Sequence, residues 1–178
     1  MVIGIDIDDT LLDSKSEIIK AWEEYYNLYD LGNYTSNVPD NINTGWNDFY
    51  IRQFWNLYRT KIAERAVAKD YAKEALYKLK LNGHVIKVVT ARPENQRLVS
   101  LKSLKSQLLT FDELILGARY KGETCKKHGI DLHIDDTQMN LDDIKSYGID
   151  TLLFKENDNW KDKYNQILAL ARHKKRRF

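Results

Sequence analysis

The chain has 178 residues, a formal net charge of +2 and 43% hydrophobic residues, which suits one folded core and provides too little apolar sequence for a membrane protein. Asp6 breaks the first apolar run, so we expect neither a signal peptide nor a membrane-spanning helix near the N-terminus. A single cysteine, Cys125, excludes an intrachain disulfide framework and a cysteine-rich zinc site, and it suits a reducing, cytoplasmic setting.

The first element along the chain is a short strand that runs directly into carboxylates. Residues 2–7 are rich in valine and isoleucine, which is typical of a buried strand, and Asp6, Asp8 and Asp9 lie at its end. Because side chains alternate along a strand, Asp6 and Asp8 leave it on the same side, where two buried like charges would repel. A hard cation such as Mg²⁺ would remove that cost. The simpler alternative is a strand followed by an acidic turn, in which Asp9 or Thr10 caps the next element.

Helical periodicity follows the strand. Apolar residues at three- and four-residue spacing predict one helix around residues 18–29 and a second, strongly aromatic helix around residues 46–58. Glycine, proline and several asparagines predict a loop at residues 31–44 between them. The helical pattern continues through residues 66–80 and is expected to stop at Gly83.

From His84 onward, predicted strands and helices alternate. Strands are expected at residues 85–89, 113–116, 131–134 and 151–154, and helices at residues 94–109, 122–128, 141–147 and 160–173. The first of these helices is expected to face the core with its leucines, including Leu98 and Leu108. This alternation predicts an α/β fold, a Rossmann-like parallel sheet of about five strands with helices on both faces.

Several polar residues fall at the ends of the predicted strands. They are Asp6, Asp8, Thr90, Asp135 and Asp136, with Lys121 ahead of the fourth strand. In open α/β sheets, ligands bind at the carboxyl ends of the strands near the point where the strand order reverses. Acidic pairs, a hydroxyl and a lysine at that edge suit a metal ion and a phosphate group. Singly, Thr90 could cap a helix, Lys121 could be a surface lysine, and the second acidic pair could form a capping turn. Their joint placement favours a site.

Four segments in this order resemble the motifs of the haloacid-dehalogenase-like phosphohydrolases. They are Asp6-Ile7-Asp8-Asp9-Thr10-Leu11, Val88-Val89-Thr90-Ala91-Arg92, Lys121, and Ile134-Asp135-Asp136. Within that superfamily, the segment at residues 90–93 and the spacing from Lys121 to Asp135 are most similar to the 5′(3′)-deoxyribonucleotidases, or C-type 5′-nucleotidases. Many members of that branch carry glycine at the position of Asp9.

The resemblance implies a Mg²⁺-dependent phosphomonoester hydrolase that acts on (deoxy)nucleoside monophosphates through an aspartyl-phosphate. It implies that Asp6 is the nucleophile and that Asp8 is the general acid and base. Thr90 and Lys121 would contact the transferring phosphoryl group. The implied Mg²⁺ ligands are Asp6, the backbone carbonyl of Asp8, Asp136 and, directly or through another ligand, Asp135.

The same resemblance explains the long segment after the first strand. A parallel crossover needs only about a dozen residues, so residues 16–80 would be an all-helical cap inserted into a core made of residues 1–15 and 81–178. Such a cap closes over the strand ends and excludes water. Its aromatic residues would either form the cap's own core or stack on a nucleobase. The candidate substrate contacts are Thr10, Arg92, Trp46, Phe49 and Trp55, together with Arg52 and Arg59.

Three other interpretations stay open. One keeps the chemistry but changes the substrate to a sugar phosphate, another small phosphomonoester or a polynucleotide end. A second is a non-catalytic receiver-like domain, which also combines acidic residues, a threonine or serine and a lysine on a parallel sheet. A third is a binding module that uses the cap or the tail at residues 172–177. The five basic residues of that tail could contact nucleic acid, although a solvated helix end is the simpler explanation.

Overall fold

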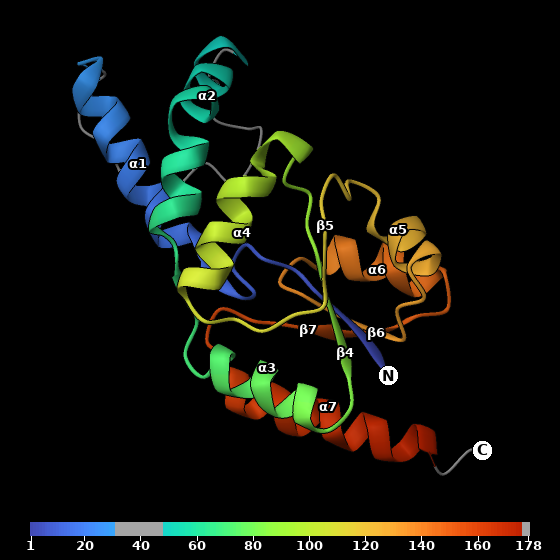
Figure 1. The fold of residues 1–178 in the computed structure, drawn as a ribbon. Coiled ribbons are helices and arrows are strands. Elements are labelled where there is room, and N and C mark those ends of the chain that lie inside the picture. Colours follow the sequence, from blue (N-terminus) through green and yellow to red (C-terminus); the bar gives the residue numbers. More distant parts are fainter. Residues whose placement is uncertain (31–47, 176–178) are drawn as a thin grey trace.

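The computed structural model describes residues 1–30 and 48–175 and has an α/β architecture (Figure 1). Its centre is a parallel five-stranded sheet in the order β5-β4-β1-β6-β7. The strands are β1 (Val2–Ile5), β4 (Val85–Val89), β5 (Glu113–Ile115), β6 (Leu132–Asp135) and β7 (Asp150–Leu153). The helices around it are α3 (Ala72–Leu81), η1 (Glu94–Gln96), α4 (Arg97–Ser106), α5 (Lys121–Lys127), α6 (Gln138–Ser146) and α7 (Trp160–Lys175). The predicted fold class is confirmed.

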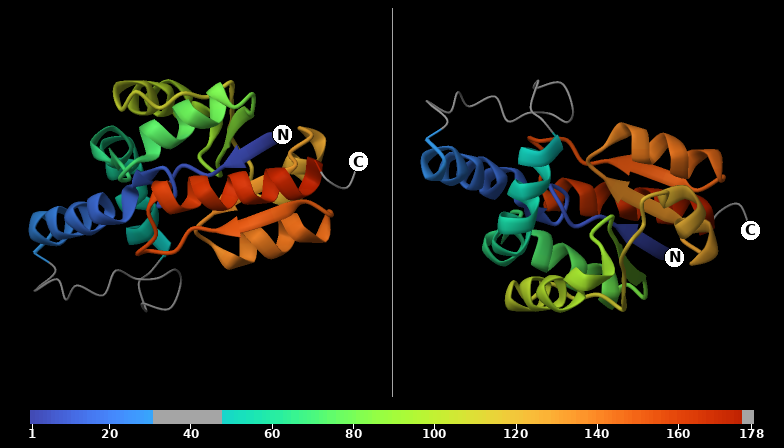
Figure 2. Two further views of the ribbon diagram at one scale, coloured as in Figure 1. Left: turned by 90° about the horizontal axis from the view of Figure 1, so that it is seen from below. Right: turned by 90° about the horizontal axis from the view of Figure 1, so that it is seen from above.

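Helices cover both faces of the sheet. Helices α3 and α7 lie side by side against one face, and α5 packs on α6 against the other (Figures 1 and 2). Strand β1 shows why both faces are covered, because its side chains are buried on both of them. Ile3 and Ile5 are fully buried in the core cluster on the α3 and α7 side. Val2 and Gly4 face the other cluster, which includes residues of α5 and α6. The alternation of side chains therefore turns positions 2, 4 and 6 toward α5 and α6.

The strand order defines one topological switch point. Counted along the chain, the strands of the main sheet run in the order 3-2-1-4-5. Receiver domains of the CheY type have the order 2-1-3-4-5, so the chain does not have the receiver topology. The order reverses between β1 and β6, and ligands bind at such a point in open α/β sheets. Asp6 follows β1 and Asp136 follows β6, so both acidic segments lie at this position.

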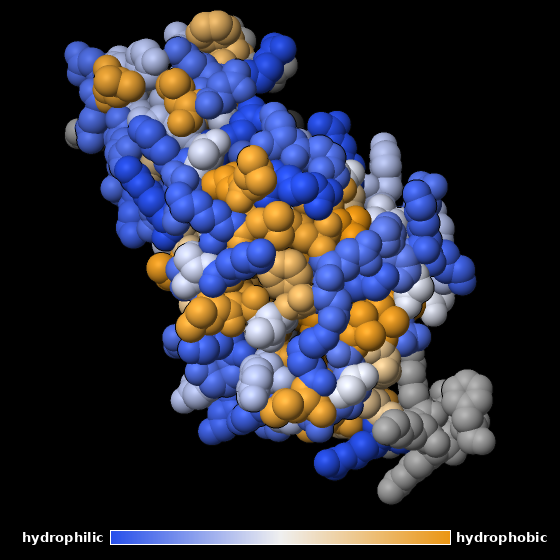
Figure 3. Space-filling model, viewed as in Figure 1, coloured by the Kyte–Doolittle hydropathy of each residue, from blue (hydrophilic) through white to orange (hydrophobic). Residues whose placement is uncertain are grey.

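Between β1 and α3, the chain builds a helical pair on a short ribbon. Helices α1 (Ser14–Leu28) and α2 (Asp48–Arg65) pack on each other, and α2 also contacts α4. Strands β2 (Leu12–Asp13) and β3 (Val67–Ala68) pair antiparallel at the base of the pair. Figure 1 shows α1 and α2 projecting from the sheet, and Figure 3 shows that their surface is mostly hydrophilic with isolated apolar groups. Within residues 12–30 and 48–68, the described part of this segment, the chain is thus mainly helical apart from the ribbon.

Stacked rings hold the helical pair together. The rings of Trp22 and Phe54 stack with centroids 3.6 Å apart and an interplanar angle of 2°. Phe54 also stacks on Tyr58, with centroids 5.3 Å apart. Tyr25 is fully buried and donates its hydroxyl to Oε1 of Gln53 at 2.9 Å. These rings form the small core that the helical spacing of the aromatic residues favours.

The continuous helical pattern expected for residues 66–80 is wrong. Helix α2 ends at Arg65, β3 follows, and α3 begins only after Tyr71, whose positive φ of 63° is incompatible with a continuing helix. The buried face of α3 belongs to the core cluster of the sheet. The division into a cap of residues 16–80 and a core of residues 1–15 and 81–178 stays a prediction, and the packing of α3 supports a cap that ends near residue 66.

The inward orientation expected for Leu98 and Leu108 is also wrong, since they are 82% and 59% exposed. Leu108 lies beyond the end of α4 in a left-handed backbone conformation, with φ 56°. The buried residues of α4 are Ser100, Ser103 and Leu104.

The loop expected at residues 31–44 and the side chain of Trp46 lie outside the described residues. No helix of the described part of the chain is both long and apolar enough to cross a membrane.

Candidate active site

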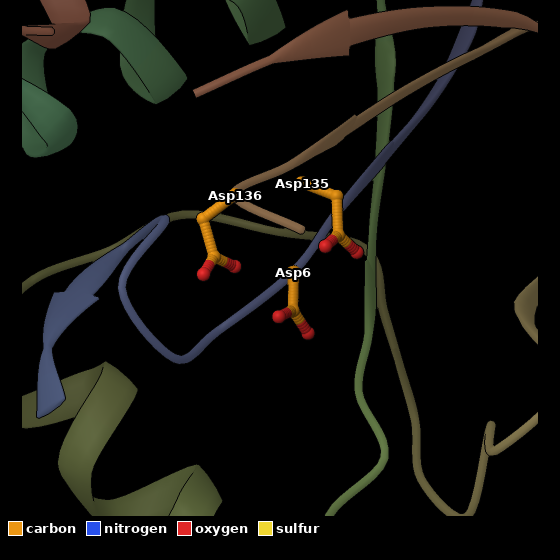
Figure 4. Close-up of side chains that lie close together, drawn as sticks. All are labelled: Asp6, Asp135 and Asp136. Carbon is orange, nitrogen blue, oxygen red and sulfur yellow. The ribbon is translucent and has the colours of Figure 1, made fainter. Parts of the chain in front are cut away.

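Three carboxyl groups meet at the switch point of the sheet. Asp6 follows β1, Asp135 ends β6 and Asp136 comes next, and one oxygen of each lies within 4.8 Å of the others. Figure 4 shows the three side chains next to one another and extending in the same direction. Asp6 and Asp135 are buried and Asp136 is half-buried. The structure therefore brings together carboxylates that are far apart in the sequence.

The ammonium group of Lys121 lies between two of these carboxylates. Its Nζ is 2.9 Å from Oδ1 of Asp6 and 2.5 Å from Oδ2 of Asp135. Lys121 is the first residue of α5, and its side chain is buried. Burial by itself would lower the pKa of Lys121, but the charges of Asp6 and Asp135 outweigh burial and raise it. Lys121 therefore carries its charge at neutral pH.

Asp135 is surrounded by hydrogen-bond donors. Its Oδ2 accepts from Lys121 and lies 3.3 Å from Nε2 of His133, while its Oδ1 accepts from the backbone N–H of Thr137 at 3.0 Å and from Nδ2 of Asn140 at 2.9 Å. Burial would raise the pKa of Asp135, but the hydrogen bond of His133 and the charge of Lys121 outweigh burial and hold it well below its usual range. Asp135 is thus an ionised group that holds Lys121.

The other two carboxylates are less well satisfied. Burial is the largest cause that raises the pKa of Asp6 and of Asp136, and the nearby charge of Asp135 raises both further; the pKa of Asp136 reaches about 6. Asp136 accepts long hydrogen bonds from Thr10 at 3.4 Å and from Thr137 at 3.5 Å. A divalent cation with oxygen ligands would favour the ionised form of both carboxylates. The residues present therefore fit Mg²⁺, and Asp6 and Asp136 are the carboxylates most available to it.

Asp8 is held by a different set of groups. Arg92 forms a two-pronged ion pair with it, Nη2 at 2.6 Å from Oδ1 and Nε at 3.0 Å from Oδ2, and Ser14 donates its hydroxyl to Oδ1 at 2.5 Å. Burial would raise the pKa of Asp8, but the charge and hydrogen bonds of Arg92 outweigh burial and lower it. The carboxylate of Asp8 does not belong to the three-carboxylate group. Its metal contact through the backbone carbonyl stays a prediction.

Arg92 links Asp8 to the segment after β4. Its guanidinium is buried and also donates through Nη1 to the hydroxyl of Ser100 at 3.2 Å. Its backbone N–H donates to Oγ1 of Thr90 at 3.1 Å. Thr90 follows β4 directly and is buried. Its contact with a phosphoryl group stays a prediction.

The turn after β1 is shaped by Asp9 and Thr10. Asp9 has a φ of 56°, in the left-handed region that glycine adopts most readily, and its side chain accepts a hydrogen bond from the backbone of Lys15 at 2.8 Å. Aspartate tolerates this conformation better than most residues, so the turn does not require glycine at position 9. Thr10 is buried, donates to Asp136, and accepts a hydrogen bond on its backbone carbonyl from Nε1 of Trp160 at 2.8 Å. Thr10 thus supports a carboxylate, and its substrate contact stays a prediction.

The candidate residues of the helical pair are not brought into the carboxylate site by any described contact. Phe49 and Trp55 are 60% and 37% exposed on α2. The guanidinium of Arg59 bonds within α2, to the carbonyl of Trp55 at 2.8 Å and to Asn56 at 2.6 Å. A substrate contact of these residues, and of Arg52, stays a prediction.

Several partners of the site were missed in the sequence. They are Ser14, His133, Asn140 and Trp160. His133 carried a usable signal, because it lies two residues before Asp135 and the period of a strand places both on one face. Trp160 carried none, since it reaches Thr10 from the opposite end of the chain.

No family model matches the chain. One curated relative, "Putative nucleotidase YqfW" of Bacillus subtilis (strain 168), is 27% identical over 174 residues, which span 93% of this chain and 82% of YqfW. Among solved structures, a haloacid-dehalogenase-like family hydrolase from Streptococcus pneumoniae has a TM-score of 0.71 at 15% identity and covers 95% of this chain and 97% of its own. A "predicted phosphoglycolate phosphatase" from Haemophilus somnus 129pt has a TM-score of 0.66 at 17% identity, with 96% and 97% covered. The resemblance seen in the four motifs is confirmed at the level of architecture, and the chain has the fold of the haloacid-dehalogenase-like hydrolases.

Proposed function

We propose that this chain is a Mg²⁺-dependent phosphomonoester hydrolase whose nucleophile is Asp6. The observation that carries the proposal is the position of Asp6, next to the ammonium group of Lys121 and beside Asp136. When bound there, Mg²⁺ would offset the negative charge of the carboxylates and of the phosphoryl oxygens. Lys121, which is buried, would supply a second, fixed positive charge next to Asp6. The names of the relative and of the solved structures support a phosphatase.

The proposed reaction has two halves. In the first, an oxygen of Asp6 attacks phosphorus and forms an aspartyl-phosphate, while the bond from phosphorus to the ester oxygen breaks and Asp8 gives that oxygen a proton. In the second, water attacks phosphorus, the bond to Asp6 breaks, and Asp8 takes the proton of the water. Phosphate and an alcohol are released, and Asp6 and Asp8 return to their starting states.

The pair of Asp8 with Arg92 bears on the first half. Arg92 keeps Asp8 ionised in the structure, so Asp8 has no proton to give while the pair is intact. The planar guanidinium of arginine also matches phosphate oxygens. We infer that Arg92 turns from Asp8 toward a phosphoryl oxygen when a substrate binds, which allows Asp8 to take up a proton from solvent. This exchange would give Arg92 the substrate contact expected from the sequence.

The substrate we propose is a (deoxy)nucleoside monophosphate. The support is the name of YqfW, at 27% identity, and the exposure of two aromatic side chains, Phe49 and Trp55, on the helical insertion. An exposed ring offers a flat surface on which a base can stack. A sugar phosphate has no aromatic base that could stack on these side chains, so kinetics can separate the two substrate classes.

The test is a panel of phosphomonoesters assayed with purified protein in excess Mg²⁺. It contains nucleoside 5′- and 3′-monophosphates, sugar phosphates, p-nitrophenyl phosphate and oligonucleotides phosphorylated at either end, with an Asp6→Asn preparation as the control for contaminating phosphatases. We expect nucleoside monophosphates to exceed sugar phosphates by roughly tenfold or more in kcat/KM. A preference for sugar phosphates or oligonucleotide ends would overturn the substrate, and no Mg²⁺-dependent release of phosphate from any of them would overturn the enzyme.

A further inference from the structure

Behind the carboxylates lies a buried histidine that the proposed reaction does not use. His133 is the second residue of β6 and is fully buried. Its Nε2 lies 3.3 Å from Oδ2 of Asp135, and its Nδ1 lies 3.6 Å from Sγ of Cys125, which is also fully buried. A continuous row of polar contacts therefore runs from Cys125 through His133, Asp135 and Lys121 to Asp6.

The partners of His133 assign its tautomer. Asp135 is an ionised carboxylate and can only accept a hydrogen bond, so the proton of the ring lies on Nε2. Nδ1 is then an acceptor, and it faces a thiol whose pKa burial raises to about 12, so the thiol keeps its proton and can donate it. Burial and the charge of Lys121 lower the pKa of His133, in agreement with a neutral ring. The imidazole thus donates in one fixed direction, toward Asp135.

Strand β1 is adapted to this ring. Gly4 pairs with His133 in the register of β1 and β6, and a Cβ at position 4 would lie 2.4 Å from Nδ1 of His133. A contact that short is not tolerated, so any larger residue at position 4 would displace the imidazole or the strand. This explains why glycine interrupts a strand of valine and isoleucine, at a position where its lack of a side chain weakens the strand. The space at Gly4 is filled by the histidine together with Ile130, whose Cδ1 would lie 2.7 Å from the same Cβ.

We propose that His133 is a positioning residue, which orients Asp135 so that Asp135 holds the ammonium group of Lys121 against Asp6. The proposal rests on the function proposed above for Asp6 and Lys121. Oδ2 of Asp135 is shared by Lys121 at 2.5 Å and His133 at 3.3 Å, so the ring fixes the rotation of the same oxygen that binds the lysine. Groups that hold catalytic or metal-binding residues in this way typically change activity about 10–100-fold when they are removed.

The test compares two polar substitutions of His133 that differ in reach. The amide nitrogen of glutamine can occupy the position of Nε2 and donate to Asp135, whereas that of asparagine reaches only the position of Nδ1. We expect H133N to lower kcat about 10–100-fold with p-nitrophenyl phosphate at saturating Mg²⁺, with little change in KM, and H133Q to restore most of this loss. Ile144→Ala, in the apolar cluster that also contains Cys125 but without a polar group that could join the row, is the stability control and should lower Tm while leaving kcat unchanged.

Equal kcat values for H133N and wild type would overturn the proposal. Equal losses of kcat in H133N and H133Q would also overturn it, because the loss of a purely structural histidine would not depend on how far the amide nitrogen of its replacement extends. A second measurement does not depend on catalysis. The ¹⁵N shifts of the imidazole in the wild-type protein report the tautomer, and we expect a neutral ring with its proton on Nε2. A neutral ring with its proton on Nδ1, which leaves Nε2 with no hydrogen to donate to Asp135, would overturn the proposal even in an active enzyme. If the wild-type protein hydrolyses no phosphoester, the proposed function fails separately, and the spectrum alone decides the contact of His133 with Asp135.

Discussion

Replacement of Arg92 by methionine should destabilise the protein, because it leaves the carboxylate of Asp8 without its charged partner. The pair is two-pronged, with contacts of 2.6 and 3.0 Å, and its side chains are 8% and 38% exposed. Exposed ion pairs contribute about 0–1 kcal/mol, whereas breaking a fully buried pair costs about 3–5 kcal/mol. This pair lies between the two classes, so we expect Arg92→Met to cost about 2–4 kcal/mol. In a protein of this size that lowers Tm by roughly 5–15 °C.

A double-mutant cycle separates the pair from the loss of arginine itself. Urea unfolding at pH 7 of wild type, Arg92→Met, Asp8→Asn and the double variant should give a coupling energy of about 1–3 kcal/mol. Arg92→Lys is the matched control, since it keeps the charge but loses the planar fork, and it should recover only part of the stability. A coupling energy below about 0.5 kcal/mol would refute the reasoning, because two independent residues give no coupling.

Three further predictions concern the chemistry, the metal and the substrate. Asp8→Asn should reduce kcat/KM, which reports the first half of the reaction, far more for a nucleoside monophosphate than for p-nitrophenyl phosphate, whose acidic phenol leaves without a proton; equal losses of kcat/KM would remove Asp8 from the general-acid role. Mg²⁺ should raise Tm by mass action, and the shift should shrink as the pH falls through about 6, where protons compete for Asp136. Asp136→Ala should weaken the shift, and an unchanged shift in calorimetry would mean that Asp136 is no ligand. If Phe49 or Trp55 stacks on a base, its replacement by leucine should lower kcat/KM for a nucleoside monophosphate about 5–100-fold but spare a ring-free phosphoester; parallel losses on both substrates would assign the ring to the structure of the helical pair.

The fold was predictable from the sequence because its signals are local. The strands from Val85 onward coincide with short runs that are rich in branched apolar residues, and the acidic pair Asp135 and Asp136 marks the end of β6. Strand alternation in an α/β sheet then brings those ends to one edge. This is why residues as distant as Asp6 and Asp136 could be predicted to lie together.

The errors come from features that depend on tertiary context. The helical pattern across residues 66–80 hides β3, because a two-residue strand has no periodicity and forms by pairing with Leu12–Asp13, which are far away in the sequence. Leu98 has helical spacing but lies outside the buried face of α4. That face consists of Ser100, Ser103 and Leu104, and its two serines are not recognisable as buried from an apolar pattern. The ion pair of Asp8 with Arg92 could not be predicted either, because the sequence indicates that both residues lie near the site but not that they bind each other.

The most direct measurement of the central claim is the covalent state of Asp6 during turnover. The protein is mixed with substrate and Mg²⁺, quenched in acid within the first turnover, digested, and analysed by mass spectrometry beside an Asp6→Asn preparation. We predict a phosphoryl group on the peptide that contains Asp6, absent without Mg²⁺ and absent from Asp6→Asn, which should also have lost phosphatase activity while keeping its fold. A phosphoryl group on another residue, or full turnover by Asp6→Asn free of contaminating phosphatase, would contradict the claim that Asp6 is the nucleophile.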